Sequence, residues 1–332
     1  MKFYKLTLTS NNRFFAWLSM ITEERILTSY FEFLKAAYRY EKSSTGGEFN
    51  IYILRRNIHR IEKGLTMRPM RKEFALRFIL PTVKGFCRLA KDQSFTLSSE
   101  YDWAAGVLRM YFAMTSSDDQ RYQDSKVQYD QFVVDSNGFN AEEIPVGYSA
   151  IETTDEFESL NSLCLHRKSV RWFDSRPVSK DSLIKALKCA TLAPSSCNRQ
   201  PYRYDIITSP EKSSKIARIS AGTIGWAHNV NCIAVLVGDL SAFSNIANRH
   251  SIYVDGTLSV MPFVLSLEAQ GLSTCIINWA DISVNEEEMR KALGLACHEK
   301  VILSIAIGYS DKNIKVPFSK RKAVSEISRF IE

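Results

Sequence analysis

The sequence predicts an α+β fold in the second half of the chain, preceded by an all-helical N-terminal region. Two continuous apolar runs of strand length, Cys232 to Gly238 and Val301 to Ile307, indicate central strands that are buried on both faces. Amphipathic helical stretches surround these runs without a strict strand–helix–strand alternation, which favours an α/β sandwich over a doubly wound sheet. Residues 1 to 150 instead carry apolar positions at helical spacing.

Composition is that of a globular chain, with 332 residues, 45% hydrophobic and 24% charged, which is long enough for two domains. No run of eighteen apolar residues occurs, and polar residues interrupt Met1 to Thr22, so neither a transmembrane segment nor a signal peptide is expected. Seven scattered cysteines without CxxC spacing indicate reduced core residues and no metal site. These features predict a cytoplasmic protein. The net charge of +7 suits an anionic cofactor or substrate.

The N-terminal region reads as helices separated by short breaks. In chain order these are a helical stretch over 13–42, a break over Ser43–Gly47, a helix from near Glu48 to Gly64 and a helical stretch over 100–134. Ala141 to Thr154 has the composition of a linker. The predicted domains are therefore a helical extension of unassigned role over 1–150 and a second domain over 151–332.

Cations greatly outnumber acids between Arg55 and Lys91. This stretch is either a patch for a polyanion, nucleotide or membrane surface, or a solvated helical face whose long side chains cover apolar surface. It lacks a helix-turn-helix pattern, a zinc finger and an aromatic-rich RNA motif. Nucleic acid is therefore not expected as a partner.

The second half alternates helices and strands of ordinary length. In chain order the predicted elements are a helix over 157–167, a helix from Ser179 to Pro194, a strand over Tyr202–Thr208, a helix from Ser209, a strand over Cys232–Gly238, a helix over Asp255–Gln270, a strand over Ser273–Asn278, a helix over Asn285–Leu293, a strand over Val301–Ile307 and a short helix within 316–332. Ser179 is the predicted N-cap of its helix, and Pro262 is expected to kink the helix that contains it.

Two polar stretches stand out as candidates for a binding site. Arg167-Lys168-Ser169-Val170-Arg171 places three cations and a hydroxyl within five residues, a set that can neutralise a phosphate and hydrogen-bond its oxygens. Ala193 to Pro201 is a turn rich in Pro, Ser and Asn, whose amides and hydroxyls suit the polar edge of a flat ring. Each stretch alone is also compatible with a solvated charged face or an ordinary loop.

Taken together, these stretches resemble the FMN-dependent nitroreductase family. The family begins with R-[RH]-S-x-[RK]-x-[FY] and continues with A-P-S-x-x-N-x-Q-P, which match the two stretches in order. Further matches follow at Gly271-Leu272-Ser273-Thr274-Cys275, Ile307-Gly308-Tyr309 and the basic cluster Lys320-Arg321-Lys322. The resemblance covers about 160–332 and implies a nitroreductase-like sandwich with a central mixed, largely antiparallel sheet flanked by helices.

The resemblance also implies a homodimer with FMN at its interface. Positions that match the family's FMN-binding residues are Arg167, Lys168 and Ser169 for the phosphate and ribityl chain, Arg171 for the N1/O2 edge, Pro194, Ser195, Ser196 and Asn198 reaching the flavin of the other subunit, and Lys320 and Arg321 for the phosphate. The family has a second C-terminal cation that binds the phosphate, and this chain has Ser319 at that position. Whether the neighbouring Lys320 takes over this role is left open by the sequence.

One departure from the family lies after the third motif. Many relatives have Glu-Gly there, whose backbone N–H groups address flavin N5, whereas this chain has Asn278-Trp279. A backbone donor needs no particular side chain, so both residues remain predicted flavin neighbours. The bulky Trp279 is also expected to shape or cover the substrate side of the ring.

By resemblance, the chain is an oxidoreductase in which NADH or NADPH donates hydride to flavin N5, and the flavin reduces a nitroaromatic, quinone-like or other conjugated small molecule. The reactive group belongs to the flavin, so no catalytic acid or base of the protein is expected. The helical extension would then either cover the active site or serve another role. The alternative is an accessory or binding protein whose basic helical region docks a partner or an anionic surface.

Overall fold

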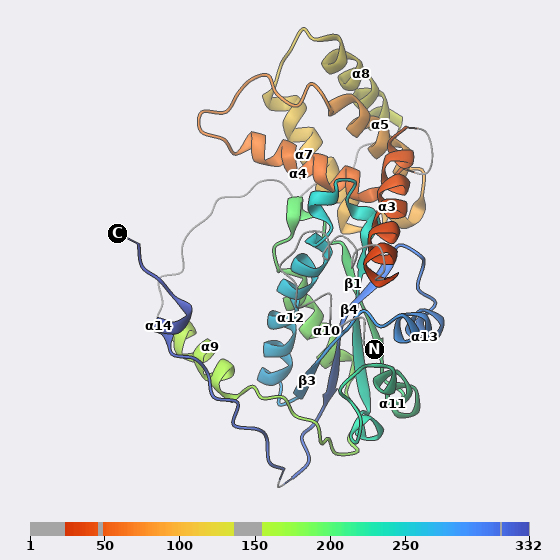
Figure 1. Cartoon of the computed structure of the whole chain (residues 1–332). Helices are drawn as coiled ribbons and strands as arrows, with labels where there is room; N and C mark the ends of the chain where they lie inside the picture. The colour runs from red at the N-terminus through yellow and green to blue at the C-terminus, as the bar shows by residue number, and fades with distance from the viewer. Residues whose placement is uncertain (1–23, 46–48, 136–154, 313, 332) are drawn as a thin grey trace.

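The computed structural model describes residues 24–45, 49–135, 155–312 and 314–331 (Figure 1). The helices before the sheet are α3 (Glu24–Thr45), α4 (Ile51–Leu65), α5 (Ile79–Leu89), α6 (Gln93–Thr96), α7 (Ser99–Met114), α8 (Gln120–Asp135), α9 (Asp155–His166) and α10 (Lys180–Thr191). The remaining elements are η1 (Ser196–Asn198), β1 (Tyr202–Ile207), α11 (Pro210–Ile219), η2 (Ala227–Asn229), β2 (Cys232–Asp239), η3 (Leu240–Ala242), η4 (Ile246–Asn248), α12 (Ser251–Ala269), β3 (Ser273–Asn278), α13 (Ser283–Leu293), β4 (Glu299–Gly308) and α14 (Val324–Ile327).

The four strands form one sheet in the order β1-β2-β4-β3, and each neighbouring pair is antiparallel. The two apolar runs of the sequence are its inner strands, β2 and β4, as predicted. Within the described residues, the parallel component of the predicted mixed sheet is limited to an isolated bridge between Ser169 and Thr274. The α+β prediction is confirmed.

Helices cover both faces of the sheet, which explains why its inner strands are apolar at consecutive positions. Because side chains alternate along a strand, Cys232, Ala234 and Leu236 of β2 face one layer and Ile233, Val235 and Val237 face the other. The first layer is formed by α10 and α12, and the second by α11 and α13 (Figure 1). Gly256 lets α12 approach closely, since a Cβ there would lie 2.5 Å from the Ile302 side chain.

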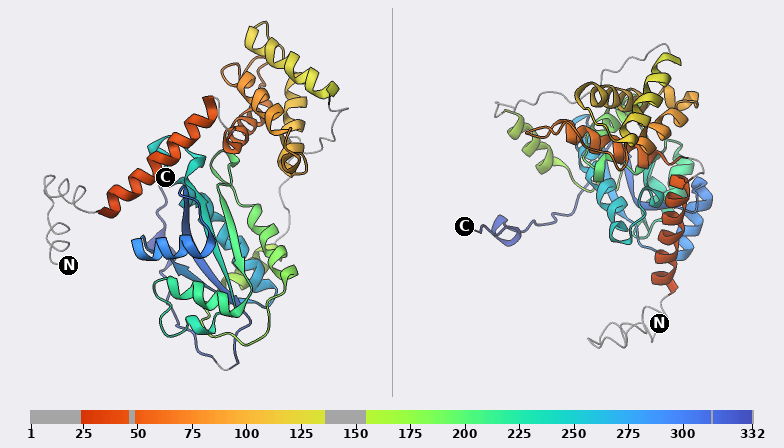
Figure 2. Two further views of the ribbon diagram at one scale, coloured as in Figure 1. Left: turned by 90° about the vertical axis from the view of Figure 1, so that its right-hand side faces the viewer. Right: turned by 90° about the horizontal axis from the view of Figure 1, so that it is seen from above.

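The helical region has a core of its own beyond one end of the sheet (Figure 2). Helices α4 to α8 bury a cluster rich in aromatic rings, in which Phe86 stacks on Tyr101 at 5.4 Å and Phe112 on Tyr129 at 4.9 Å. Helix α3 packs elsewhere: its Phe33 contacts the cluster of η3 and α12 around Phe243. The first described helix thus shares its core with the sheet-bearing unit.

Several element boundaries differ from the sequence prediction by one to four residues, as for α12, which begins at Ser251 and not at Asp255, and two further differences lie in the helical region. Helix α3 continues through Thr45, so the predicted break does not begin at Ser43. The stretch 100–134 is two helices, because the backbone turns extended at Thr115, with φ of −118° and ψ of 157°, and Asp119 caps the next helix by accepting from Arg121 N at 2.9 Å. The predicted helix start at 13, the linker 141–154 and the domain boundary near 150 lie outside the described residues.

The N-cap at Ser179 is confirmed, since its hydroxyl accepts from Ser182 N at 3.1 Å. The prediction for the cysteines is right for Cys232 and Cys275, which are buried, and wrong for Cys164 and Cys297, which are exposed. The scattered spacing of the cysteines argues against a disulfide framework, but it does not show whether a given cysteine lies on the buried or the exposed face of its helix or strand.

One stretch, Ile246–Ala269, is long and apolar enough to cross a membrane by length and composition alone, with a mean hydropathy of 1.2. It contains α12, whose inner face carries buried Phe263, Val264 and Leu267 against the sheet. A helix in the core of a folded domain passes the same test, so this stretch is weak evidence for a membrane span.

Candidate functional site

The cationic segment 167–171 runs in extended conformation from the end of α9 along the edge strand β3. Val170 N donates to Thr274 O at 3.0 Å, and Ser169 bridges the same residue. Buried Val170 anchors the segment in the core layer of α11 and α13, while Arg167, Lys168, Ser169 and Arg171 stay half-buried beside it. The alternation of apolar and polar residues therefore fixes the segment and leaves its cations at the surface of the sheet edge.

The segment carries two guanidinium groups beside β3, Arg167 at its start and Arg171 at its end. Burial raises the pKa of the Cys275 thiol of β3, and the charges of Arg171 and Arg167 act in the opposite direction. The Arg171 guanidinium also lies 5.9 Å from the ring centroid of Trp226. The segment thus presents a concentrated positive potential at this end of the sheet.

The loop 194–198 lies at the opposite end of the sheet. It leads into β1, whose first residue, Tyr202, pairs with Gly238, and Gly238 pairs with Lys300. Thr274, beside the cationic segment, pairs with Ile307 of the same strand as Lys300. At about 3.3 Å per residue, these two levels of β4 are separated by about 23 Å. A single chain does not bring the two predicted halves of the site together.

The loop holds a strained backbone. Cys197, Asn198 and Gln200 have φ values of 52°, 51° and 48°, a region that residues with a side chain seldom occupy. Internal hydrogen bonds support this conformation: Gln200 N donates to Ser195 Oγ and Gln200 Nε2 to Asn198 Oδ1, both at 2.9 Å. Pro194 is exposed, and Ser196 N donates to buried Asp255 of α12 at 3.0 Å.

Arg55 of the helical region binds this loop. The sequence analysis did not single it out as a site residue. Its side chain is only 9% exposed, and its Nε donates to Asn198 O at 2.8 Å. Its Nη1 lies 2.8 Å from Glu100 Oε1, and its guanidinium is 5.3 Å from the Trp103 ring centroid. The sequence marked Arg55 only as the start of a basic stretch, because its partner lies 143 residues away.

Replacement of Asp255 by asparagine is expected to stabilise the protein at neutral pH. Burial raises the pKa of Asp255, and one of its carboxylate oxygens has no partner among the described residues. The folded state therefore binds a proton that the unfolded chain has released, and stability falls as pH rises from about 4 through the folded pKa. Asp255→Asn is neutral throughout and keeps an oxygen for Ser196 N.

Urea unfolding across this pH range checks the prediction. The advantage of the variant should be present at pH 7 and shrink as the pH approaches 4. A wild-type protein that is more stable at both values would contradict the assignment of an uncompensated buried carboxylate.

Asn278 and Trp279 lie at the end of β3. Asn278 is exposed and pairs with Leu303, whereas Trp279 is buried in the layer of α11 and α13. The Trp279 indole N–H donates to Glu286 of α13. The Trp279 ring thus packs in the core of its own chain. Only the Asn278 side chain and the backbone at the end of β3 lie at the edge of the sheet.

Lys320 and Arg321 lie on an extended C-terminal arm that leaves the body after Asp311 (Figures 1 and 2). Both side chains are exposed, and neither forms a hydrogen bond or ion pair with a described residue. The structure does not bring them into contact with the segment 167–171 of the same chain.

Comparison with known proteins gives a family match over part of the chain. The model of the Nitroreductase family matches residues 165–224. The NAD(P)H nitroreductase YdgI of Bacillus subtilis is 26% identical over 165 residues, covering 49% of this chain and 76% of that protein. Human iodotyrosine deiodinase 1 is 20% identical over 217 residues, covering 57% of this chain and 75% of that protein. An FMN-dependent nitroreductase structure from Clostridium difficile covers 51% of this chain and 98% of its own, with 22% identity and a TM-score of 0.44.

The matched residues contain both motifs of the sequence analysis, the cationic segment and the loop before β1. The helices α3 to α8 fall outside the family match. Residues 165–224 in the C-terminal region thus match the nitroreductase family, and the helical N-terminal region is separate from that match.

Proposed function

We propose that the protein is an FMN-dependent oxidoreductase that takes reducing equivalents from NADH or NADPH and delivers them to a nitroaromatic, quinone-like or other conjugated small molecule. The observation that supports this proposal is the cationic segment 167–171, which lies within the family-matched residues and is held along β3 by the hydrogen bond from Val170 N to Thr274 O, with Arg167 and Arg171 half-buried beside the strand. An anionic cofactor would neutralise the positive charge of these two arginines.

The residues present fit such a cofactor. Neither Arg167 nor Arg171 forms an ion pair with a carboxylate among the described residues, and Lys168 donates only to Leu165 O, at 2.7 Å. The half-buried Ser169 lies between Arg167 and Arg171 on the same segment. Unneutralised guanidinium groups and a hydroxyl are the donor set that a phosphate monoester requires.

FMN would supply the hydride chemistry, and the protein would supply orientation and electrostatics. Arg167, Lys168 and Ser169 would hold the phosphate and ribityl chain. Arg171 would stabilise negative charge at the N1/O2 edge, because a fixed cation costs no reorganisation when that charge develops.

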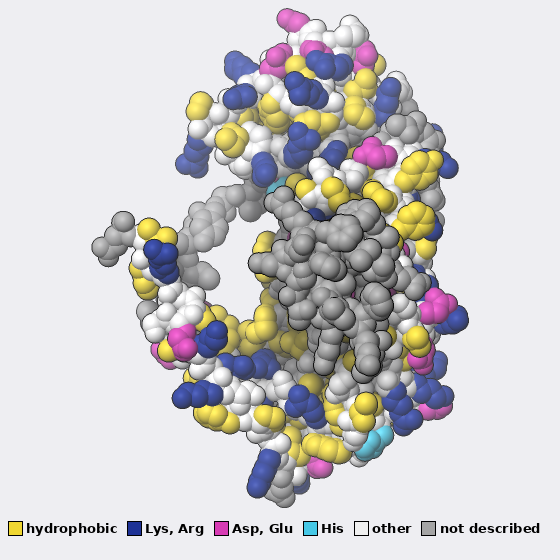
Figure 3. Space-filling model, viewed as in Figure 1, with side chains coloured by type: hydrophobic (Ala, Val, Ile, Leu, Met, Phe, Trp, Pro, Cys, Tyr) yellow, Lys and Arg dark blue, Asp and Glu magenta, His cyan; other side chains and the backbone are white. Residues whose placement is uncertain are grey.

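The proposal includes a homodimer, which the same geometry supports. The loop 194–198 lies about 23 Å along the sheet from the cationic segment, so in this proposal a second copy supplies the loop to the cofactor. Large apolar side chains are exposed on α9, on α12 and along the C-terminal arm (Figure 3): Phe157, Leu160, Leu165, Val254, Leu258, Met261, Phe318, Ile327 and Phe330. Exposed apolar patches mark protein interfaces. The arm would then bring Lys320 and Arg321 to the phosphate.

The direct test is to purify the chain, record its visible spectrum, and measure NADH and NADPH oxidation with a nitroaromatic, a quinone and an iodotyrosine as acceptors. Bound flavin and turnover of at least one acceptor are expected. The iodotyrosine is included because deiodinases are among the relatives. Absence of flavin absorbance together with no binding of added FMN would leave the accessory-protein alternative.

Replacement of Arg167 by glutamine is expected to weaken FMN binding by about tenfold to a hundredfold, the usual value of a charge-assisted hydrogen bond to phosphate. Titration of apoprotein with FMN, followed by quenching of flavin fluorescence, measures this. Arg176→Gln is the matched control, because that arginine is 61% exposed and paired with Asp174 at 2.7 Å. Equal effects of the two substitutions would contradict the placement of the phosphate.

A further inference from the structure

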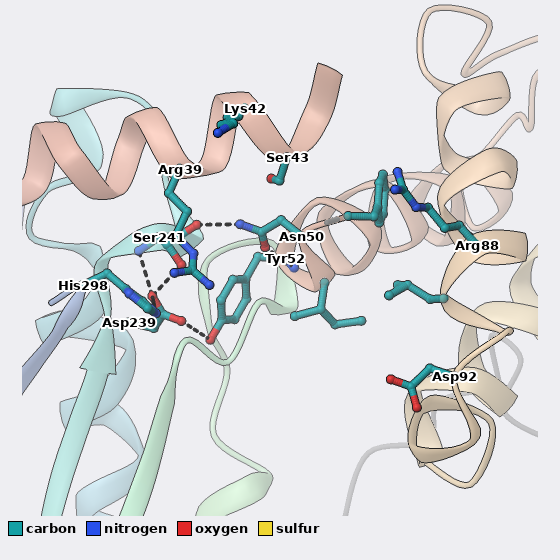
Figure 4. Close-up of a pocket in the computed structure, with 13 residues that line it drawn as sticks. Arg39, Lys42, Ser43, Asn50, Tyr52, Arg88, Asp92, Asp239, Ser241 and His298 are labelled. Atoms are coloured by element: carbon teal, nitrogen blue, oxygen red, sulfur yellow. Dashed lines mark hydrogen bonds and ion pairs between the residues drawn. The ribbon is translucent and has the colours of Figure 1, made fainter. Parts of the chain in front are cut away.

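A cavity of about 700 Å³ lies where the helical region meets the sheet-bearing unit (Figure 4). Its walls come from α3, the first turn of α4, the α5–α6 corner, the end of β2 and the start of β4. The volume is that of a typical small-molecule pocket. None of its lining residues belongs to the predicted FMN-binding set.

Three cationic side chains line the cavity, and two of them, Arg39 and Arg88, have no ion-pair partner among the described residues. Arg39 reaches in from α3 and Arg88 from α5 on the opposite wall (Figure 4). Neither forms an ion pair with a described residue, and both are exposed to solvent. Lys42 lines the same space one turn after Arg39. The N-terminal end of the fifteen-residue helix α4, with no acidic residue in its first turn, adds the positive end of its dipole.

The carboxylates of the cavity are already engaged. Asp239 accepts from Tyr52 Oη at 3.1 Å and from Ser241 N and Oγ at 2.8 and 2.7 Å. Asp92 accepts from both Ser94 N and Ser94 Oγ at 2.8 Å, and these bonds lower its pKa. The acids therefore serve local structure, while the arginines remain available to an anion.

The rest of the lining adds one polar atom and an apolar surface. His298 Nδ1 is buried at the cavity and has no hydrogen-bond partner among the described residues, so it can receive a ligand atom. Phe49, Ile51 and Leu89 supply apolar and aromatic area between the two arginines. Such a wall suits a flat ring rather than a bare ion.

We propose that this cavity binds a small molecule that carries both a phosphate group and an aromatic ring. Arg39, beside the first turn of α4 and its dipole, holds the phosphate, the ring lies against Phe49 and Ile51, and Arg88 on the opposite wall borders the ring. Because the walls come from both parts of the chain, the ligand also joins the helical region to the sheet-bearing unit.

Isothermal titration calorimetry on the full chain, without added flavin, tests the site with AMP, adenosine and inorganic phosphate as probes. AMP is expected to bind more tightly than inorganic phosphate, and adenosine to give no measurable heat. Arg39→Gln and Arg88→Gln are each expected to weaken AMP binding by about tenfold or more. Both side chains are exposed, so the substitutions should leave the fold intact, which circular dichroism checks.

Two control variants separate this site from the proposed flavin site. Lys84→Gln removes an exposed charge from α5 outside the cavity, and Arg167→Gln removes the predicted FMN phosphate contact. Both should bind AMP as the wild-type protein does, whether or not the chain binds FMN. The proposal is overturned if AMP does not bind at millimolar concentration, if inorganic phosphate binds as tightly as AMP, or if only Arg167→Gln reduces AMP binding.

Discussion

Replacing Lys300 with methionine is expected to lower the free energy of unfolding by about 3 kcal/mol or more at neutral pH. The Lys300 side chain is 7% exposed, and its Nζ lies 3.0 Å from both Glu32 Oε2 and Glu286 Oε2. Removal of the ammonium leaves two carboxylates facing each other in a largely water-excluded site. Guanidinium chloride unfolding monitored by circular dichroism measures the loss.

Lys291→Met provides the matched control. Lys291 pairs with Glu287 at 3.1 Å on α13, but both side chains are more than half exposed. An exposed pair of this kind contributes about 0.5 kcal/mol or less. Losses of the same size in the two variants would show that burial does not strengthen the Lys300 cluster.

The pH dependence of the Lys300 cluster has a defined sign. Burial lowers the pKa of Lys300, but the charges of Glu286 and Glu32 together with their hydrogen bonds outweigh it, so the folded pKa is raised. This stabilisation is complete below about pH 10.4, the pKa of lysine in an unfolded chain, and is lost as pH rises through the folded value. From neutral pH upward, the stability difference between the wild-type protein and Lys300→Met should therefore narrow only above about pH 10.4.

Much of the sheet-bearing unit could be predicted because its signals are local. The strand Ser273–Asn278 was predicted with its exact bounds from its sequence, and Gly294 ends α13 in the left-handed conformation with φ of 66°. A capping hydroxyl, a left-handed glycine and an apolar run act over a few residues. The anchoring of Ser169 beside β3 was also within reach, since the motif carries a buried valine between its cations.

Contacts between distant segments were beyond the sequence. The apolar face of α3 indicates that the helix is buried, but not that Phe33 packs on η3 rather than on the other helices. Lys300 reads as a charge at the start of a strand, and nothing local announces Glu32 as its partner. The two halves of the predicted flavin site likewise carry no signal that they occupy opposite ends of one sheet.

Replacing Arg55 with methionine is expected to lower the free energy of unfolding by about 2 to 3 kcal/mol, because it removes a buried ion pair and a hydrogen bond at once. Arg55 connects Glu100 of the helical region to the carbonyl of Asn198, whose φ of 51° is unfavourable without support. Urea unfolding provides the measurement. Lys63→Met, an exposed change on the same helix, should cost less than about 0.5 kcal/mol.

Arg55→Met is also expected to affect the proposed FMN binding, through the loop 194–198. If the loop of one subunit contacts the FMN of the other, loss of the Arg55 bond frees about one residue's backbone, and FMN binding should weaken by about tenfold. Arg55→Lys keeps the charge near Glu100 but cannot reproduce the planar donor that reaches Asn198 O. It should therefore recover part of the stability and little of the FMN affinity. Full recovery of both by lysine would mean that the helical region stabilises the loop by charge only, and not by fixing the carbonyl of Asn198.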